Sequence, residues 1–179
     1  YLKATLEMLG IHALYLGIVS DDPVAYRKLL EQVLKDGADI IISTGAVSMG
    51  KFDFVANTLQ ELSAKTYFHK AAIRPGKPIL FAEFEKSKNR CVFFGVPGNP
   101  VSTAVGLRFF IEPYIRAFLG QPEEKPVFAK LLNQFSKPQG LKCFFKGRSH
   151  TTEHGVEVEV LKGQASYIVS ALLDANCWG

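Results

Sequence analysis

The chain has 179 residues, of which 47% are hydrophobic and 21% are charged, an ordinary balance for a globular protein. This length is enough for one well-buried domain and a small companion. Glycine, proline or charge interrupts every apolar run well before the ~20 residues that a membrane helix needs, which argues against a membrane protein. The net charge of +4 comes from scattered basic residues, a pattern that argues against nucleic acid and favours a small anionic ligand.

The cysteines and the two ends of the sequence bear on where the protein works. Cys91, Cys143 and Cys177 form no CxxC pair, and no histidine near them has zinc-ligand spacing. We therefore expect reduced structural thiols in a cytoplasmic protein. The sequence opens at Tyr1 inside an apparent amphipathic helix, so we expect a chain that is cut at both ends.

Apolar spacing and turn residues predict an alternation of helices and strands. Helices are expected at 2–9, 24–35, 54–62 and 101–119, and strands at 13–19, 39–43, 67–72, 79–84 and 91–94. This order predicts an α/β fold with a doubly wound, mostly parallel sheet. Shorter β segments are expected at 127–132, 141–145 and 156–161. The predicted domains are an α/β domain at 1–120 without its first strand, a linker at 121–126, and an incomplete β-rich domain at 127–179.

The loop after the predicted strand at 39–43 combines glycines with a hydroxyl and a carboxylate. Gly45 and Gly50 leave backbone amides open to an oxyanion, and Ser48 adds a hydroxyl. Asp53 stands where it would either cap the next helix or hold Mg²⁺ against a phosphate. For this loop alone, an ordinary turn with a helix cap explains the residues better than an anion site does.

A second loop lies where the predicted strand at 91–94 leads into the helix at 101–119. Gly98 and Asn99 occupy a stiff turn between prolines, and Ser102 follows in the first turn of the helix. The free amides and the dipole of a helix N-terminus attract anions. A plain strand-to-helix turn with local caps remains the alternative for this segment.

A third loop, RPGKP at 74–78, carries two cations three residues apart. Lone basic residues in loops are usually solvated, but the prolines, including Pro78, hold Arg74 and Lys77 on a rigid turn. A fixed pair of cations suits a doubly charged tetrahedral oxyanion. At 21–22, helix capping is the favoured explanation of the two aspartates, and Asp22 is also a candidate for the same metal as Asp53. Together the loops predict a phosphorylated, nucleotide-like ligand with a divalent metal.

Four of these motifs, in this order, resemble the MoeA/gephyrin E-domain family of molybdopterin molybdenumtransferases. They are DDP at 21–23, GAVSMG at 45–50 with DF at 53–54, RPGKP at 74–78, and PGNPVS at 97–102. The resemblance covers about residues 1–120 and implies a molybdopterin-binding, MogA-like fold. It also implies a homodimer, a pterin substrate, and a possible link to an adenylyltransferase domain, with no nucleic acid or membrane as partner.

The resemblance implies a molybdenum insertase, which transfers molybdate into adenylylated molybdopterin, releases AMP and uses Mg²⁺. The implied catalytic residues are Asp53, Lys77 and Arg74, and the implied metal ligands are Asp53 and Asp22. The implied substrate-binding residues are Gly45, Ser48, Gly50, Pro78, Gly98, Asn99, Ser102 and Ser166. Lys142 matches a further oxyanion contact, at a position where the family has arginine.

Three residues depart from the family pattern, and two other functions remain open. Ala46 replaces a glycine, Lys51 a commonly acidic residue, and Arg74 a common lysine. The first alternative is the adenylyltransferase that makes the substrate, which shares the core fold. The second is a non-catalytic molybdopterin-binding or scaffold module of the gephyrin kind. The RPGKP turn and the β-rich tail favour the insertase.

Overall fold

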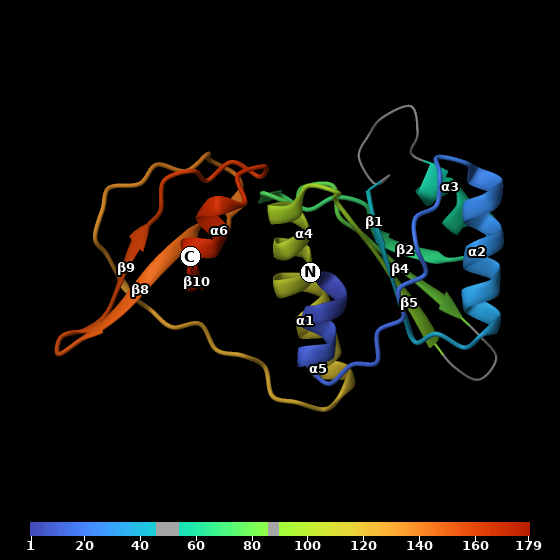
Figure 1. Ribbon diagram of the computed structural model, residues 1–179, viewed down its shortest axis with the longest axis horizontal. Helices are drawn as coiled ribbons and strands as arrows, with labels where there is room; N and C mark the ends of the chain where they lie inside the picture. Colours follow the sequence, from blue (N-terminus) through green and yellow to red (C-terminus); the bar gives the residue numbers. More distant parts are fainter. Residues whose placement is uncertain (46–53, 86–89) are drawn as a thin grey trace. The chain divides into compact units, whose positions relative to one another are not determined.

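The computed structural model describes residues 1–45, 54–85 and 90–179, and the chain forms two compact units (Figure 1). The first unit consists of Tyr1–His69 and Leu80–Gly95, and the second of Lys70–Ile79 and Val96–Gly179. Because residues 70–79 and 96–120 join the C-terminal part, these units do not coincide with the domain division predicted at 121–126, which stays a prediction. Among the described residues, no helix combines the length and the apolar character needed to cross a membrane.

The first unit is built on a four-stranded sheet in the order β1-β5-β4-β2, with bounds Ile40–Thr44, Arg90–Val96, Leu80–Glu85 and Lys65–Phe68. The predicted α/β class is confirmed. The sheet is mixed rather than mostly parallel, because β4 pairs antiparallel with both β5 and β2. Residues 86–89 alone join β4 to β5, and parallel strands need a crossover of a dozen or more residues.

Helices α2 (Pro23–Lys35) and α3 (Phe54–Glu61) pack against this sheet (Figure 1). Tyr26 and Leu30 of α2 and Val55 and Leu59 of α3 form a core with alternate residues of the strands, among them Leu80, Ala82, Phe84, Cys91 and Phe93. The spacing of three or four on the helices and of two on the strands brings these side chains together. The short helix α1 (Leu2–Met8) buries Leu6 and is followed by Gly10 at φ +78°.

The predicted strand at 13–19 is wrong. The chain forms no strand there, and Leu14, Tyr15, Leu16 and Ile18 are 53–92% exposed. An apolar run becomes a strand only when a neighbouring strand pairs with its backbone, and within the described residues none does. Val19, at the end of the run, does pack against the core of the first unit.

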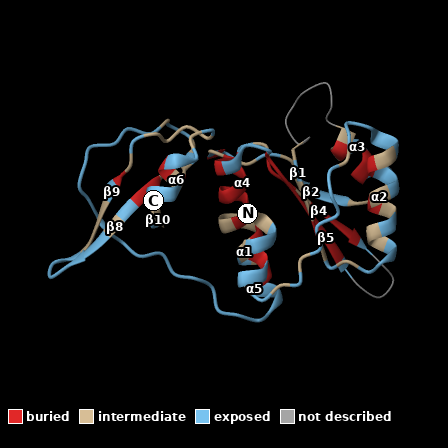
Figure 2. Cartoon of the chain, viewed as in Figure 1, coloured by how far each residue is buried: buried red, intermediate tan, exposed pale blue. Residues whose placement is uncertain are grey.

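The second unit contains the long helix predicted at 101–119. It is made of α4 (Pro100–Gly106), a π-helical turn η1 (Leu107–Ile111) and α5 (Glu112–Phe118). The wide turn precedes Pro113, which lacks an N–H and whose ring would crowd the carbonyl of Phe109 in a regular helix. All residues of α4 after Pro100 are buried, as Figure 2 shows.

The rest of the second unit is β-rich, as predicted. One sheet has the order β10-β8-β9-β6, with bounds Cys177–Trp178, Lys146–Thr152, Gly155–Val160 and Lys130–Leu131. A two-stranded parallel ladder joins β3 (Ile73–Arg74) to β7 (Lys142–Cys143), and α6 spans Ser170–Asp174. The strands predicted at 127–132 and 141–145 are shorter than expected. The sequence analysis missed β8 because most of its residues are polar.

Candidate functional site

The predicted site residues fall into three groups. Asp22 and Gly45 belong to the first unit, and Gly45 follows β1 with φ +81°. Ser48, Gly50 and Asp53 lie outside the described residues. The others all belong to the second unit: Arg74, Lys77, Pro78, Gly98, Asn99, Ser102 and Ser166. The geometry of the site can therefore be followed within the second unit.

The RPGKP loop at 74–78, called the basic turn below, is held in place by backbone hydrogen bonds. The N–H of Phe144 donates to the carbonyl of Arg74 at 2.8 Å, which continues the β3–β7 ladder past its end. The carbonyl of Lys77 accepts from the N–H groups of Ala71 and Ile79, both at 3.0 Å. The side chains of Arg74 and Lys77 are exposed. The turn therefore presents two cations from a backbone that is held at both ends.

The same turn lies against α4. Gly76 is buried and has φ +102°, a conformation that glycine adopts without strain. A Cβ on Gly76 would lie 3.3 Å from Cδ1 of Ile73 and 3.7 Å from the carbonyl oxygen of Ser102. Two motifs that are separate in the sequence thus meet at the start of α4. Ser102 itself is only 5% exposed, and Pro78 is half-buried.

Asn99 and Ser166 form a direct contact. The side-chain amide of Asn99 donates to the Ser166 hydroxyl at 3.2 Å, across 67 residues of sequence. Asn99 and Gly98 are exposed, while Ser166 is half-buried. The Thr103 hydroxyl also lies within hydrogen-bonding distance of the carbonyls of Pro97 and Asn99, which anchors the turn to the helix. Two predicted substrate-binding residues are therefore brought together by tertiary structure.

The sequence analysis missed Lys146, a buried lysine that binds the loop containing Ser166. Only 1% of it is exposed, and its ammonium donates to three backbone carbonyls, those of Gly163, Ala165 and Ile168. Burial lowers the pKa of the Lys146 ammonium. Its position in the sequence carries no signal of burial, because it begins a strand in which most residues are polar.

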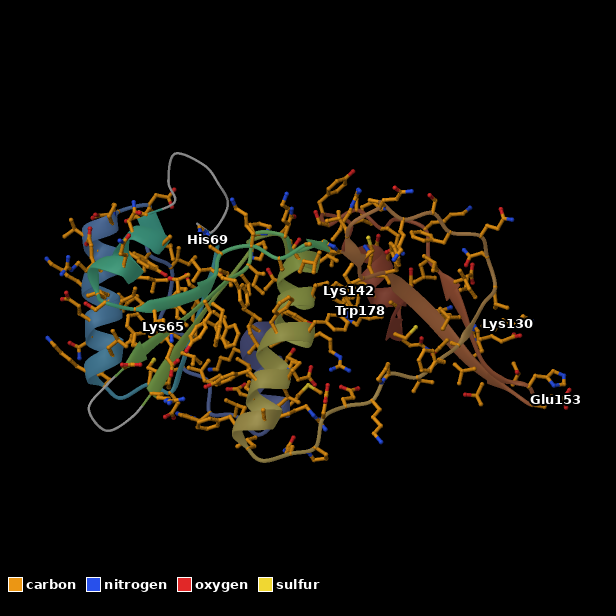
Figure 3. The ribbon with its side chains drawn as sticks, turned by 180° about the vertical axis from the view of Figure 1, so that it is seen from behind. Lys65, His69, Lys130, Lys142, Glu153 and Trp178 are labelled. Atoms are coloured by element: carbon orange, nitrogen blue, oxygen red, sulfur yellow. The ribbon has the colours of Figure 1, made fainter. Side chains whose placement is uncertain are left out.

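Lys142 lies close to the basic turn. It stands opposite Ile73 in the β3–β7 ladder, so it neighbours Arg74 across the strands. Figure 3 shows Lys142 and Trp178 at one end of the β-rich part, and Lys130 and Glu153 toward the tip of the β8–β9 hairpin. Lys142 is exposed, but strand alternation directs its side chain to the face of Ile73 rather than to that of Arg74.

Asp22 has a structural role in α2. Its Oδ1 accepts a hydrogen bond from the N–H of Val24 at 2.9 Å, which makes it the N-cap of the helix. In the part of the chain that the structure describes, no three His, Cys, Asp or Glu side chains gather as a metal site. Asp53, the other expected metal ligand, lies outside the described residues, so the Mg²⁺ site stays a prediction.

The capping role of Asp22 can be tested by chemical denaturation. We expect Asp22→Ala to lower the free energy of unfolding by about 0.5–2 kcal/mol, because an amide at the start of α2 loses its acceptor. Asp22→Asn keeps a capping oxygen and removes the charge, so its stability should stay within a few tenths of a kcal/mol of the wild type. Equal losses in the two variants would show that the carboxylate charge, rather than the cap, matters.

Comparisons with known proteins agree with this combination of an α/β domain and loops rich in glycine and proline. A family model described as "Probable molybdopterin binding domain" matches residues 1–117. The chain therefore belongs to this molybdopterin-binding family, and the resemblance carried by the four motifs is confirmed.

Relatives with established names extend the match over nearly the whole chain. The molybdopterin molybdenumtransferase of Synechococcus elongatus is 37% identical over 178 residues, which are 99% of this chain and 43% of that protein. The Haemophilus influenzae protein of the same name is 32% identical over 180 residues, again 43% of its length. This chain thus spans less than half of the length of these relatives.

A solved structure supports the fold. The tungsten cofactor synthesizing protein MoaB from Pyrococcus furiosus aligns with a TM-score of 0.53 and 18% sequence identity. The alignment covers 68% of this chain and 82% of the MoaB chain. At this identity the likeness concerns the fold alone, and it agrees with the predicted MogA-like architecture.

Proposed function

We propose that this chain supplies the oxyanion-binding part of a molybdopterin molybdenumtransferase, an enzyme of molybdenum cofactor biosynthesis. The proposed reaction transfers molybdate into adenylylated molybdopterin and releases AMP. The observation that carries the proposal is the gathering of the basic turn, the start of α4 and the Asn99–Ser166 pair within one compact unit. The names of the relatives point to the same reaction class.

The described residues have chemistry that suits a tetrahedral dianion. Arg74 and Lys77 supply two positive charges from a fixed turn, and a guanidinium binds two oxygens in parallel. The Asn99 amide and the Ser166 hydroxyl supply neutral donors beside each other. A rigid backbone lowers the entropic cost of holding these groups around the anion.

Several parts of the proposal rest on the family resemblance alone. They are the catalytic role of Asp53, a Mg²⁺ ion held by Asp53 and Asp22, and substrate contacts of Gly45, Ser48 and Gly50. The homodimer and the link to an adenylyltransferase domain are proposed on the same ground, whereas the proposed cytoplasmic location rests on the cysteine pattern. When bound, Mg²⁺ would neutralise phosphate charge during cleavage of the phosphoanhydride.

The reaction is tested by AMP release from adenylylated molybdopterin in the presence of molybdate, using the protein that carries this chain. We expect turnover by the wild type, and a loss of about 100-fold or more in Asp53→Ala with substrate binding largely kept, because a catalytic carboxylate acts mainly on the transition state. Normal turnover by Asp53→Ala would remove the role given to Asp53. Adenylylation of molybdopterin from ATP would favour the adenylyltransferase, and binding without either reaction would favour the scaffold module.

A further inference from the structure

The ammonium of Lys146 is completely engaged inside the second unit. Its Nζ donates to the carbonyls of Gly163 at 2.7 Å, Ile168 at 3.0 Å and Ala165 at 3.3 Å. An ammonium has three N–H donors, so the three carbonyls use all of them. Because the residue is only 1% exposed, it has no donor left for a ligand. Lys146 is therefore placed to organise the protein rather than to bind an anion directly.

The three carbonyls belong to one loop, residues 163–168, which leads from β9 to α6. The side chain of Gln164 ties the same loop to the main chain of Lys146: it accepts from the N–H at 3.0 Å and donates to the carbonyl at 2.9 Å. A buried charge is stable only when its hydrogen bonds are satisfied, so the loop and the lysine depend on each other. Lys146 thus contacts this loop through both its ammonium and its main chain.

Ser166 lies in the middle of this loop, between two of the carbonyls that Lys146 binds. Its hydroxyl accepts from the amide of Asn99 at 3.2 Å. We propose that Lys146 is the positioning residue for Ser166, holding the loop so that the serine hydroxyl stays beside Asn99 at the oxyanion site. This inference rests on the proposed function for its ligand, but the positioning itself is measurable without one.

The first test is ligand-free hydrogen exchange across residues 161–169. Lys146→Met keeps the length of the side chain and removes every donor, so we expect exchange at the Ile168 amide to become about tenfold faster or more. Lys146→Arg supplies enough donors and should restore most of the protection. Lys162→Met, the same change at an exposed lysine beside the loop, is the matched control and should exchange like the wild type. Unchanged exchange in Lys146→Met would overturn the proposal.

The second test is a double-mutant cycle on molybdate affinity, measured by calorimetry. We expect Lys146→Met and Ser166→Ala each to weaken binding by about tenfold. If Lys146 acts through Ser166, adding Lys146→Met to Ser166→Ala should cause little further loss. Additive losses would overturn the proposal, since a general loss of structure has no reason to depend on the Ser166 hydroxyl. An unchanged affinity in Lys146→Met would overturn it as well.

The two tests separate this inference from the proposed function. If the wild type binds no molybdate, the proposed function fails. Whether Lys146 positions Ser166 is then still decided by the hydrogen-exchange rates and by the NMR signals of the Asn99 side-chain amide. We expect those amide signals to move in Lys146→Met and to return in Lys146→Arg; unmoved signals would overturn the proposal. If Lys146→Met does not fold, Lys146→Gln takes its place, with two neutral donors and a smaller expected effect in the same direction.

Discussion

Replacing Arg74 and Lys77 together by glutamine is expected to weaken molybdate binding by about 100-fold. Each residue loses one charge-assisted interaction with the dianion, while glutamine keeps a polar side chain of similar reach. The backbone of the turn should keep its place, because the bonds to Phe144, Ala71 and Ile79 involve main-chain atoms alone. The effect should therefore appear in the dissociation constant and leave the melting temperature nearly unchanged.

The matched control for this variant removes the same charge elsewhere in the second unit. Lys125 and Lys137 are exposed, and their double replacement by glutamine lowers the net charge by the same amount. Long-range attraction alone would weaken binding equally in both double variants. Equal losses, or an affinity close to that of the wild type in the Arg74 and Lys77 variant, would contradict the role of the basic turn.

The second large effect is expected at Gly106, where α4 lies against the end of β5. A Cβ on Gly106 would lie 2.7 Å from Cγ1 of Val96, closer than atoms in a packed protein approach. Val96 is fully buried and β-branched, so its methyl group has little freedom to move. Alanine favours a helix over glycine, yet we expect Gly106→Ala to lower the free energy of unfolding by about 1–2 kcal/mol, because overpacking outweighs that gain.

A compensating substitution identifies the contact. Val96→Ala leaves a cavity and is destabilising on its own, but it removes the methyl group that Gly106→Ala would meet. We expect the double variant to be at least about 1 kcal/mol more stable than the sum of the two single losses predicts. Additive losses in denaturant unfolding would show that another neighbour, such as Ile79, limits the space at Gly106.

The elements that the sequence predicted well are those with local causes. Asp22 and Pro23 begin α2 where expected, since a capping oxygen and a fixed φ act within one turn. Glycines with positive φ follow the helices at Gly10, Gly37 and Gly120, because glycine takes up this helix-ending conformation without strain. The order of the four motifs was enough to indicate the family, because it is a property of the sequence itself.

The sequence predicted which residues belong to the candidate site, but it did not predict which of them lie in contact. The sequence indicated anion-binding turns at 74–78 and 97–102, which stay predictions, and only the tertiary structure shows that the two turns approach each other at Gly76 and Ser102. Nothing local indicates that Asn99 meets Ser166 or that Lys146 holds the loop beneath it. The roles of Asp53, Ser48 and Gly50 stay predictions.

What the sequence by itself determined is therefore the placement of the helices within residues 1–120, the α/β class and the family, whereas α6 was not predicted. The tertiary structure decided the direction of β4 against its neighbours, the absence of a strand at 13–19, and the buried position of Lys146. The physical reason is the distance along the sequence over which each kind of interaction acts. Caps and turns act over a few residues, whereas a strand needs a partner and a buried cation needs acceptors, and both come from distant parts of the chain.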